Sequence, residues 1–132
     1  MPPGRTSPNV AAVFDAYDLA RKAKHEELRT RIVDDAIWLP AKEAQWNPCR
    51  NADQIVQTLL WRAGMNRMRP TEPLDLGDRV LVKVRGRHLT KLGARGLFPT
   101  LFQIFAFRNG KIVSIHDYVR RDEAYAAAGL KA

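Results

Sequence analysis

Asp117 is the residue of this sequence best suited to donate or accept a proton. It lies near the end of the stretch from Gly110 to Tyr118, where alternation along a strand places it on one side with Val113 and Ile115. An ionised carboxylate among aliphatic side chains is costly unless it is paired, hydrogen-bonded or neutralised by a raised pKa. The pattern therefore predicts a general base that removes a proton next to a carbonyl group.

A structural role is the alternative for Asp117. Its carboxylate could pair with Arg79 or Arg120, or it could cap the last helix of the chain. Pairing with an arginine would lower the pKa of the carboxyl group and argue against a base. The sequence leaves both roles open.

The dipeptide Asn109-Gly110 predicts a two-residue hairpin turn, because both central residues of such a turn adopt positive φ. Pairing counted outward from this turn without any irregularity places Phe102 opposite Asp117. Directly opposed residues share a face of the sheet, so His116 points away from Asp117. The pocket residues predicted on the face of Asp117 are Phe102, Ile104 and Ile115.

Three further side chains are candidates for the same pocket. Tyr17, on the first helix, and His88, after a strand of alternating valines, could each donate a hydrogen bond to a developing oxyanion. Trp38 is a candidate wall. The alternatives are a buried tyrosine with a satisfied hydroxyl, a histidine in a solvated loop and a tryptophan that only packs. No histidines have metal-ligand spacing and no glycine-rich phosphate loop is present, so we expect neither a metal nor an organic cofactor.

Composition indicates a single globular domain over residues 1–132, with residues 1–6 disordered or extended. A chain of 132 residues with 45% hydrophobic and 27% charged side chains is long enough for a hydrophobic core. No apolar run approaches the ~18 residues that a membrane-spanning helix needs. Cys49 is the only cysteine, and the N-terminus shows no apolar signal core. We therefore expect a cytoplasmic protein without membrane contact.

The formal net charge of +8 is concentrated in one stretch of the chain. Residues 79–116 contain eight Lys or Arg and no Asp or Glu. This face could be a solvated surface, the rim of a dimer interface, or a phosphate-binding stripe that stacks nucleic acid on Phe105 and Phe107. No nucleic-acid-binding motif accompanies it, so nucleic acid is the least favoured partner. Strand alternation gathers the basic face from Lys83, Arg85 and Arg87.

Apolar periodicity predicts helices first and mainly antiparallel strands after them, which is an α+β layout. Ser7-Pro8 begins the first helix, Asn51 caps the third, and Pro70 stops it. One apolar face of the sheet lacks a cover, and a homodimer would supply it most simply. The expected helices cover residues 8–20, 22–31, 51–68 and 122–128, and the expected strands cover residues 36–39, 80–85, 101–107 and 111–118.

Several short segments, spread over nearly the whole chain, resemble the SnoaL-like branch of the nuclear transport factor 2-like superfamily. The resemblance implies a curved antiparallel sheet wrapped around N-terminal helices. Such a sheet forms a cone with an internal pocket, as in cystatin-like folds, and commonly dimerises through its outer face. The segments are Val13-Phe14-Asp15-Ala16-Tyr17, Asp35-Ala36-Ile37-Trp38, residues 75–82, residues 107–113 leading to Asp117-Tyr118, and Ala127-Ala128-Gly129-Leu130.

The resemblance also implies a role for Asp117. In SnoaL-like polyketide cyclases, an aspartate at this spacing serves as acid and base. Many of them have His-x-Asp there, whereas this chain has Ile115-His116-Asp117, so no histidine partner is expected. Ketosteroid isomerases and limonene epoxide hydrolases share the fold, and one fold hosts many functions.

The resemblance therefore implies a small-molecule-binding domain. The expected activity is cofactor-independent isomerisation or cyclisation of an apolar, carbonyl-bearing substrate. The alternative is a non-catalytic module that binds a ligand or assembles as a dimer.

Overall fold

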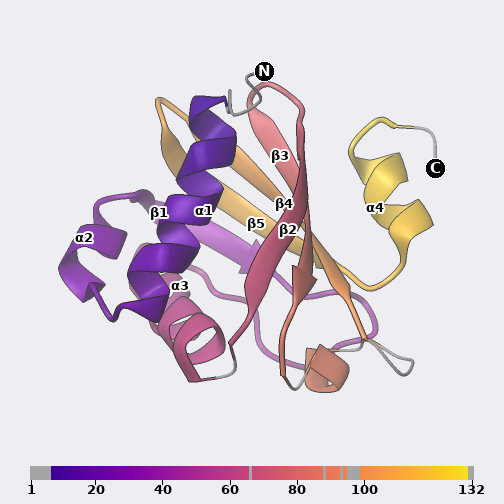
Figure 1. Ribbon diagram of the computed structural model, residues 1–132, viewed down its shortest axis with the longest axis horizontal. Coiled ribbons are helices and arrows are strands. Elements are labelled where there is room, and N and C mark those ends of the chain that lie inside the picture. Colours follow the sequence, from indigo (N-terminus) through magenta and orange to yellow (C-terminus); the bar gives the residue numbers. More distant parts are fainter. Residues whose placement is uncertain (1–6, 66, 88, 93, 95–98, 131–132) are drawn as a thin grey trace.

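A computed structural model describes residues 7–65, 67–87, 89–92, 94 and 99–130 of the chain (Figure 1). The expectation for residues 1–6 and the candidate His88 lie outside the described residues. In chain order the elements are α1 (Pro8–Arg21), α2 (His25–Arg29), β1 (Ile32–Leu39), α3 (Ala52–Leu59), the π-helix η2 (Leu60–Met65), β2 (Arg69–Asp75), β3 (Arg79–Arg85), the 3₁₀ helix η3 (Leu89–Leu92), β4 (Leu101–Arg108), β5 (Lys111–Tyr118) and α4 (Arg121–Ala127).

The helices begin at the capping residues that the sequence indicates. The Ser7 hydroxyl accepts a hydrogen bond from the backbone N–H of Val10 at the start of α1. Asn51 caps α3 in the same way. The third helix differs from expectation, because its α-helical part ends at Leu59 and continues as the π-helix η2 instead of running to Met68. Such wide turns are frequent at functional sites.

The five strands form one mixed sheet in the order β1-β5-β4-β3-β2. Strands β2 to β5 pair antiparallel, as expected. Strand β1 instead runs parallel to β5, with Trp38 beside Ile115. No hairpin joins these two strands, and the long connection between them permits the parallel direction.

A β-bulge changes the expected register of the last hairpin. The turn itself forms as expected, with φ of 53° at Asn109 and 77° at Gly110. Phe107 then pairs with Ile112, after which the register shifts because β5 contains one residue more than β4 at this point. Counting residues outward from the turn cannot reveal this extra residue, because nothing in the local sequence marks it.

The bulge replaces the expected neighbours of Asp117. Gln103, and not Phe102, lies opposite Asp117. Phe102 and Ile104 therefore lie on the reverse face of the sheet, and their expected place beside Asp117 was wrong. Ile115 stays on the face of Asp117, fully buried in the main core.

Helices cover both faces of the sheet (Figure 1). Helices α1 and α3 pack on the inner face and enclose the main core with it. Helix α4 packs on β4 and β5 from the other side, which we call the outer face. The apolar surface expected to bind a second copy is thus covered by this chain, while the homodimer stays a prediction. The outer cluster consists of Leu81, Phe102, Ile104, Ala124 and Ala128.

The basic residues lie around the outer face of the sheet, and the aromatic residues expected beside them lie elsewhere. Lys83 Nζ lies 3.6 Å from a carboxylate oxygen of Glu72. Arg85 and Arg87 are exposed. None of the described helices is long and apolar enough to cross a membrane. Two aromatic residues expected on the basic face are buried on the inner face instead: Phe105 and Phe107.

Candidate functional site

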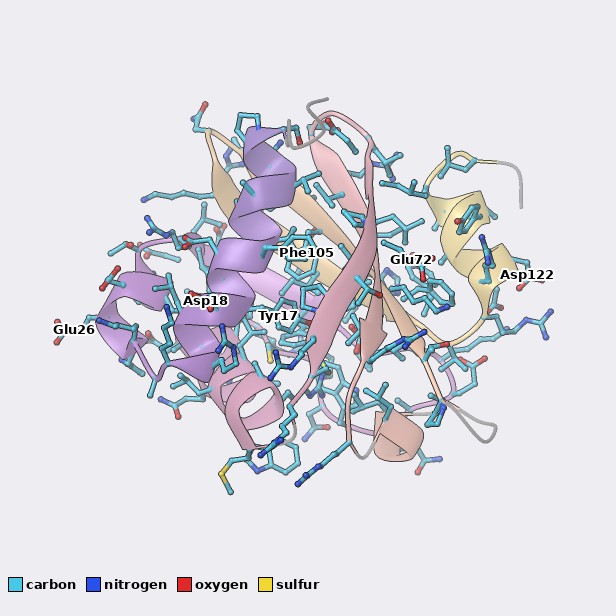
Figure 2. All side chains as sticks on the ribbon, viewed as in Figure 1. Tyr17, Asp18, Glu26, Glu72, Phe105 and Asp122 are labelled. Carbon is cyan, nitrogen blue, oxygen red and sulfur yellow. The ribbon has the colours of Figure 1, made fainter. Side chains whose placement is uncertain are left out.

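Asp117 is fully buried and is held through one of its two carboxylate oxygens. Trp38 Nε1 donates a hydrogen bond to Oδ1 at 2.8 Å, and Gln103 Nε2 donates to the same oxygen at 2.9 Å. The Tyr17 hydroxyl in turn donates to Gln103 Oε1 at 2.5 Å. Figure 2 shows Tyr17 where α1 faces the sheet, next to Phe105. One hydrogen-bonded chain thus links α1, β1, β4 and β5.

A buried arginine faces the second carboxylate oxygen. The Arg62 side chain is 5% exposed, and its Nη1 lies 3.6 Å from Asp117 Oδ2. This distance permits an ion pair but is too long for a hydrogen bond. The guanidinium carbon lies 4.6 Å from the ring centroid of Trp38 and 4.3 Å from that of Trp46, within the range of cation–π contacts. The two indoles hold the guanidinium group next to the carboxylate.

Burial dominates the proton affinities in this site. It raises the pKa of Asp117 from 3.8 to about 6, although Arg62, Trp38 and Gln103 act in the opposite direction. Burial also lowers the pKa of Arg62 and raises that of Tyr17. A carboxyl group with a pKa of about 6 changes its protonation state near neutrality, as an acid/base group must.

Hydrogen bonding in the site is incomplete. Buried polar groups are nearly always hydrogen-bonded, and each bond left unmade costs roughly 1–3 kcal/mol. The unpartnered atoms belong to residues that contact or adjoin one another, so this cost falls on one place in the fold. Among the described residues, the buried side-chain atoms without a hydrogen-bond partner are Glu43 Oε1, Trp46 Nε1, Arg62 Nε, Arg62 Nη1 and Asp117 Oδ2.

Two cavities adjoin the hydrogen-bonded chain at opposite ends. A cavity of about 440 Å³ lies between α1 and the start of β2, with Tyr17 in its wall. A second cavity, of about 230 Å³, lies where β5 ends and reaches Asp117. This second cavity is open at the end of β5, and Asp117 is among the residues that line it, while its carboxylate itself is fully buried. Its walls are formed by Ala41, Lys42, Glu43, His116, Asp117, Tyr118 and Glu123.

The sequence matches no protein-family model and no curated protein. Several solved structures do resemble the chain. An LEH-like epoxide hydrolase of M. tuberculosis is 14% identical with a TM-score of 0.64, and the match covers 93% of this chain and 90% of that one. A proposed polyketide cyclase from Sinorhizobium meliloti is 20% identical with a TM-score of 0.59, over 85% of this chain and 94% of that one.

A third solved structure is described by the name of its fold. It is an NTF2-like protein from Burkholderia pseudomallei, 16% identical with a TM-score of 0.59, and the match covers 92% of this chain and 97% of that one. The protein has the nuclear transport factor 2-like fold. The fold expected from the sequence is thereby confirmed, and identities of 14–20% establish the fold alone.

Within this nuclear transport factor 2-like fold, part of the expected constellation does gather around Asp117. Trp38 bonds to Asp117 directly, and Tyr17 is linked to it through Gln103. Ile115 lies two residues before Asp117 on the same face. Other candidates do not take part: His88 lies outside the described residues, and Phe102 and Ile104 pack beneath α4.

The structural partners expected for Asp117 are engaged elsewhere. Arg79 donates hydrogen bonds to the last carbonyl groups of α4. The C-terminal end of a helix carries a partial negative charge, so a cation is favoured there. Arg120 pairs with Asp122 and is itself the N-cap of α4. His116 points to the outer face, as expected, and stacks on Tyr118 with ring centroids 4.3 Å apart.

The sequence did not single out Arg62 or Gln103. Arg62 follows Leu59 by three residues and Ile55 by seven, so helical spacing places it on the buried stripe, and a charge there was an available signal. Gln103 was not predicted beside Asp117, because the bulge that brings it opposite Asp117 has no signature in the sequence. No cluster of His, Cys, Asp or Glu suited to a metal ion occurs in the described part of the chain.

Proposed function

We propose that the protein binds a small apolar, carbonyl-bearing molecule and uses Asp117 as its acid/base residue, in a cofactor-independent isomerisation or ring closure. One observation carries the proposal. Asp117 has one oxygen fixed by two donors and a second, Oδ2, without any hydrogen bond, while its pKa is raised to about 6. A carboxylate that served only as a structural acceptor would use both oxygens.

The chemistry follows from this asymmetry. Asp117 Oδ2 accepts a proton from the carbon next to the ligand carbonyl, the C–H electron pair forms a C=C bond, and the carbonyl oxygen gains the negative charge. Trp38 and Gln103 hold Oδ1 and so fix the direction in which Oδ2 points. Returning the proton to a different carbon completes an isomerisation. Closing a ring onto the nucleophilic carbon completes a cyclisation.

The structural neighbours support this class of function without specifying it. One is described as an epoxide hydrolase and another as a proposed polyketide cyclase, and both act on small molecules by these descriptions. An interior site in this fold is therefore a reasonable place for a small ligand.

Deuterium exchange tests proton abstraction without knowledge of the natural product. The protein is incubated in D₂O with 2-cyclohexenone, acetophenone and 2-hydroxy-1-phenylethanone, and loss of the proton signal next to each carbonyl is followed by NMR. We expect at least one ketone to exchange faster than in buffer. Asp117→Asn should slow that exchange by about 10²-fold or more, because the base is lost.

Asp78→Asn is the matched control, since it makes the same chemical change at an exposed carboxylate and should leave the exchange rate unchanged. A thermal melt of each variant excludes unfolding as the cause. Equal exchange in the wild type and in Asp117→Asn would contradict the proposal. Saturable binding of a ketone without exchange would instead favour a non-catalytic ligand-binding module.

A further inference from the structure

The donors of the site that lack a hydrogen bond belong to Arg62, which faces Asp117, and to Trp46, which contacts Arg62. Arg62 retains Nε and Nη1, and Trp46 retains its indole N–H, all of them buried. The guanidinium carbon of Arg62 lies 4.3 Å from the centroid of the Trp46 ring. These donors come from η2 and from the segment between β1 and α3. Together they suit one oxygen that accepts hydrogen bonds.

Two buried acceptors of the site also lack a hydrogen bond, and one of them lies beside Arg62. Asp117 Oδ2 is 3.6 Å from Arg62 Nη1, and Glu43 Oε1 belongs to the segment that also carries Trp46. Glu43 and Asp117 line the same cavity of about 230 Å³. These acceptors suit a group that donates a hydrogen bond, such as a hydroxyl group.

Charge excludes the simpler ligands. An anion would satisfy Arg62 but would add a negative charge beside Asp117 and Glu43. An amine would satisfy the two carboxylates but would place a positive charge beside Arg62 and leave its N–H groups unbound. A neutral molecule that has both an acceptor and a donor meets both sets of atoms.

We propose that the ligand carries a hydroxyl group adjacent to its carbonyl group, with the carbonyl oxygen bound by Arg62 and Trp46 and the hydroxyl group bound by Asp117 Oδ2. This inference rests on the proposed function and narrows its substrate class to α-hydroxy ketones. It also gives Arg62 a role in the reaction: Arg62 binds the carbonyl oxygen of the ligand, which gains negative charge when Asp117 removes a proton.

Two ligands that differ by one hydroxyl group test the inference by isothermal titration calorimetry at pH 7: 2-hydroxy-1-phenylethanone and acetophenone. The wild-type protein should bind the hydroxy ketone at least about tenfold more tightly, as expected for one hydrogen bond to a charged group. Trp46→Phe should weaken both ligands by about fivefold, because it removes a donor to the shared carbonyl oxygen.

Asp117→Asn separates the two halves of the site. The amide oxygen keeps the hydrogen bonds from Trp38 and Gln103, so the NH₂ group takes the place of Oδ2 and an acceptor becomes a donor. The preference for the hydroxy ketone should vanish, while acetophenone still binds. Asp78→Asn should preserve the preference. Arg62→Met should weaken the binding of both ligands. If this variant does not fold, Trp46→Phe and Asp117→Asn still test the inference.

Equal affinity of the wild type for the two ligands would overturn the inference. So would an equal loss of both affinities in Asp117→Asn, or no binding of either ligand at millimolar concentration. Failure of the proposed function looks different. A hydroxyl preference that depends on Asp117, without deuterium exchange in any ketone, would keep the ligand class and refute the acid/base role. Deuterium exchange that depends on Asp117, without a preference for the hydroxy ketone, would keep the acid/base role and refute the ligand class.

Discussion

The carboxyl group of Asp117 is subject to two opposing influences. Arg62 and two hydrogen-bond donors favour its charged form, and complete burial disfavours it. Burial is the larger effect, so the folded protein binds this proton more tightly than the unfolded chain does, with a pKa of about 6 against 3.8. Stability from this group is therefore fully present below pH 3.8 and is lost as the pH rises through 6.

Asp117→Asn should remove this pH dependence. We expect the free energy of unfolding of the wild type, minus that of the variant, to fall by about 2 kcal/mol between pH 4 and pH 7 and then to level off. Urea unfolding at each pH, followed by tryptophan fluorescence, measures the difference. Carboxylates whose pKa values are lowered, such as Asp18 and Asp34, cancel because both proteins contain them. A difference that rises with pH would show that the arginine outweighs burial.

The sequence predicted the carboxylate at the centre of the candidate site and only part of its surroundings. The aliphatic neighbours of Asp117 singled it out, and helical and strand periodicity indicated Tyr17 and Trp38, which the structure links to it by hydrogen bonds. The charge that faces Asp117 was not predicted, because the partner lies 55 positions earlier, in a helix whose pitch changes just before it. Arg62 meets Asp117 only through tertiary packing, which no local pattern encodes.

At the scale of elements, a close backbone contact fixes the exit of the π-helix that carries Arg62. The backbone N–H of Met68 donates to the carbonyl oxygen of Arg62 at 3.0 Å. A Cβ at Gly86 would lie 2.7 Å from the Met68 Cα, closer than such atoms approach. Glycine at position 86 therefore lets the end of β3 pack against the segment after η2.

Gly86→Ala should destabilise the protein by about 1–3 kcal/mol, because rigid backbone must move to accept the methyl group. Gly64→Ala is the control within the π-helix, where the added Cβ would lie 3.8 Å from the Ala20 carbonyl oxygen, an ordinary contact. This control should be neutral or stabilising by up to about 1 kcal/mol, since alanine favours helix. Denaturant unfolding compares the two. Equal stability of both variants would contradict the importance of the Met68 contact.

Element types followed from the sequence more securely than their relations did. Capping residues located the starts of α1 and α3, and Asn109-Gly110 located the last hairpin. The parallel pairing of β1 and the bulge in β5 were missed, because each depends on a partner strand and not on the local sequence. One extra residue in β5 was enough to exchange Phe102 for Gln103 beside Asp117.

At the scale of the whole molecule, α4 changes the argument for a homodimer. The sequence predicts a dimer because the outer face of the sheet is apolar. In the single chain this surface already lies beneath α4, with Phe102 8% and Ile104 7% exposed. A dimer through the outer face therefore requires that α4 moves away or forms part of the interface.

A chain that ends at Arg120 should self-associate more strongly than the full chain, because removing α4 exposes the apolar cluster of β3 and β4. Sedimentation velocity over a range of concentrations gives the mass of each protein, and circular dichroism checks that the sheet is retained. Replacing Phe102 with serine in the shortened chain should reverse the association, since Phe102 contributes apolar surface to that face. A shortened chain that stays monomeric would show that the outer face does not drive association. A full-length dimer of unchanged affinity after truncation would place the interface elsewhere, with the exposed Ile37 and Leu39 of the β1 edge as the next surface to test.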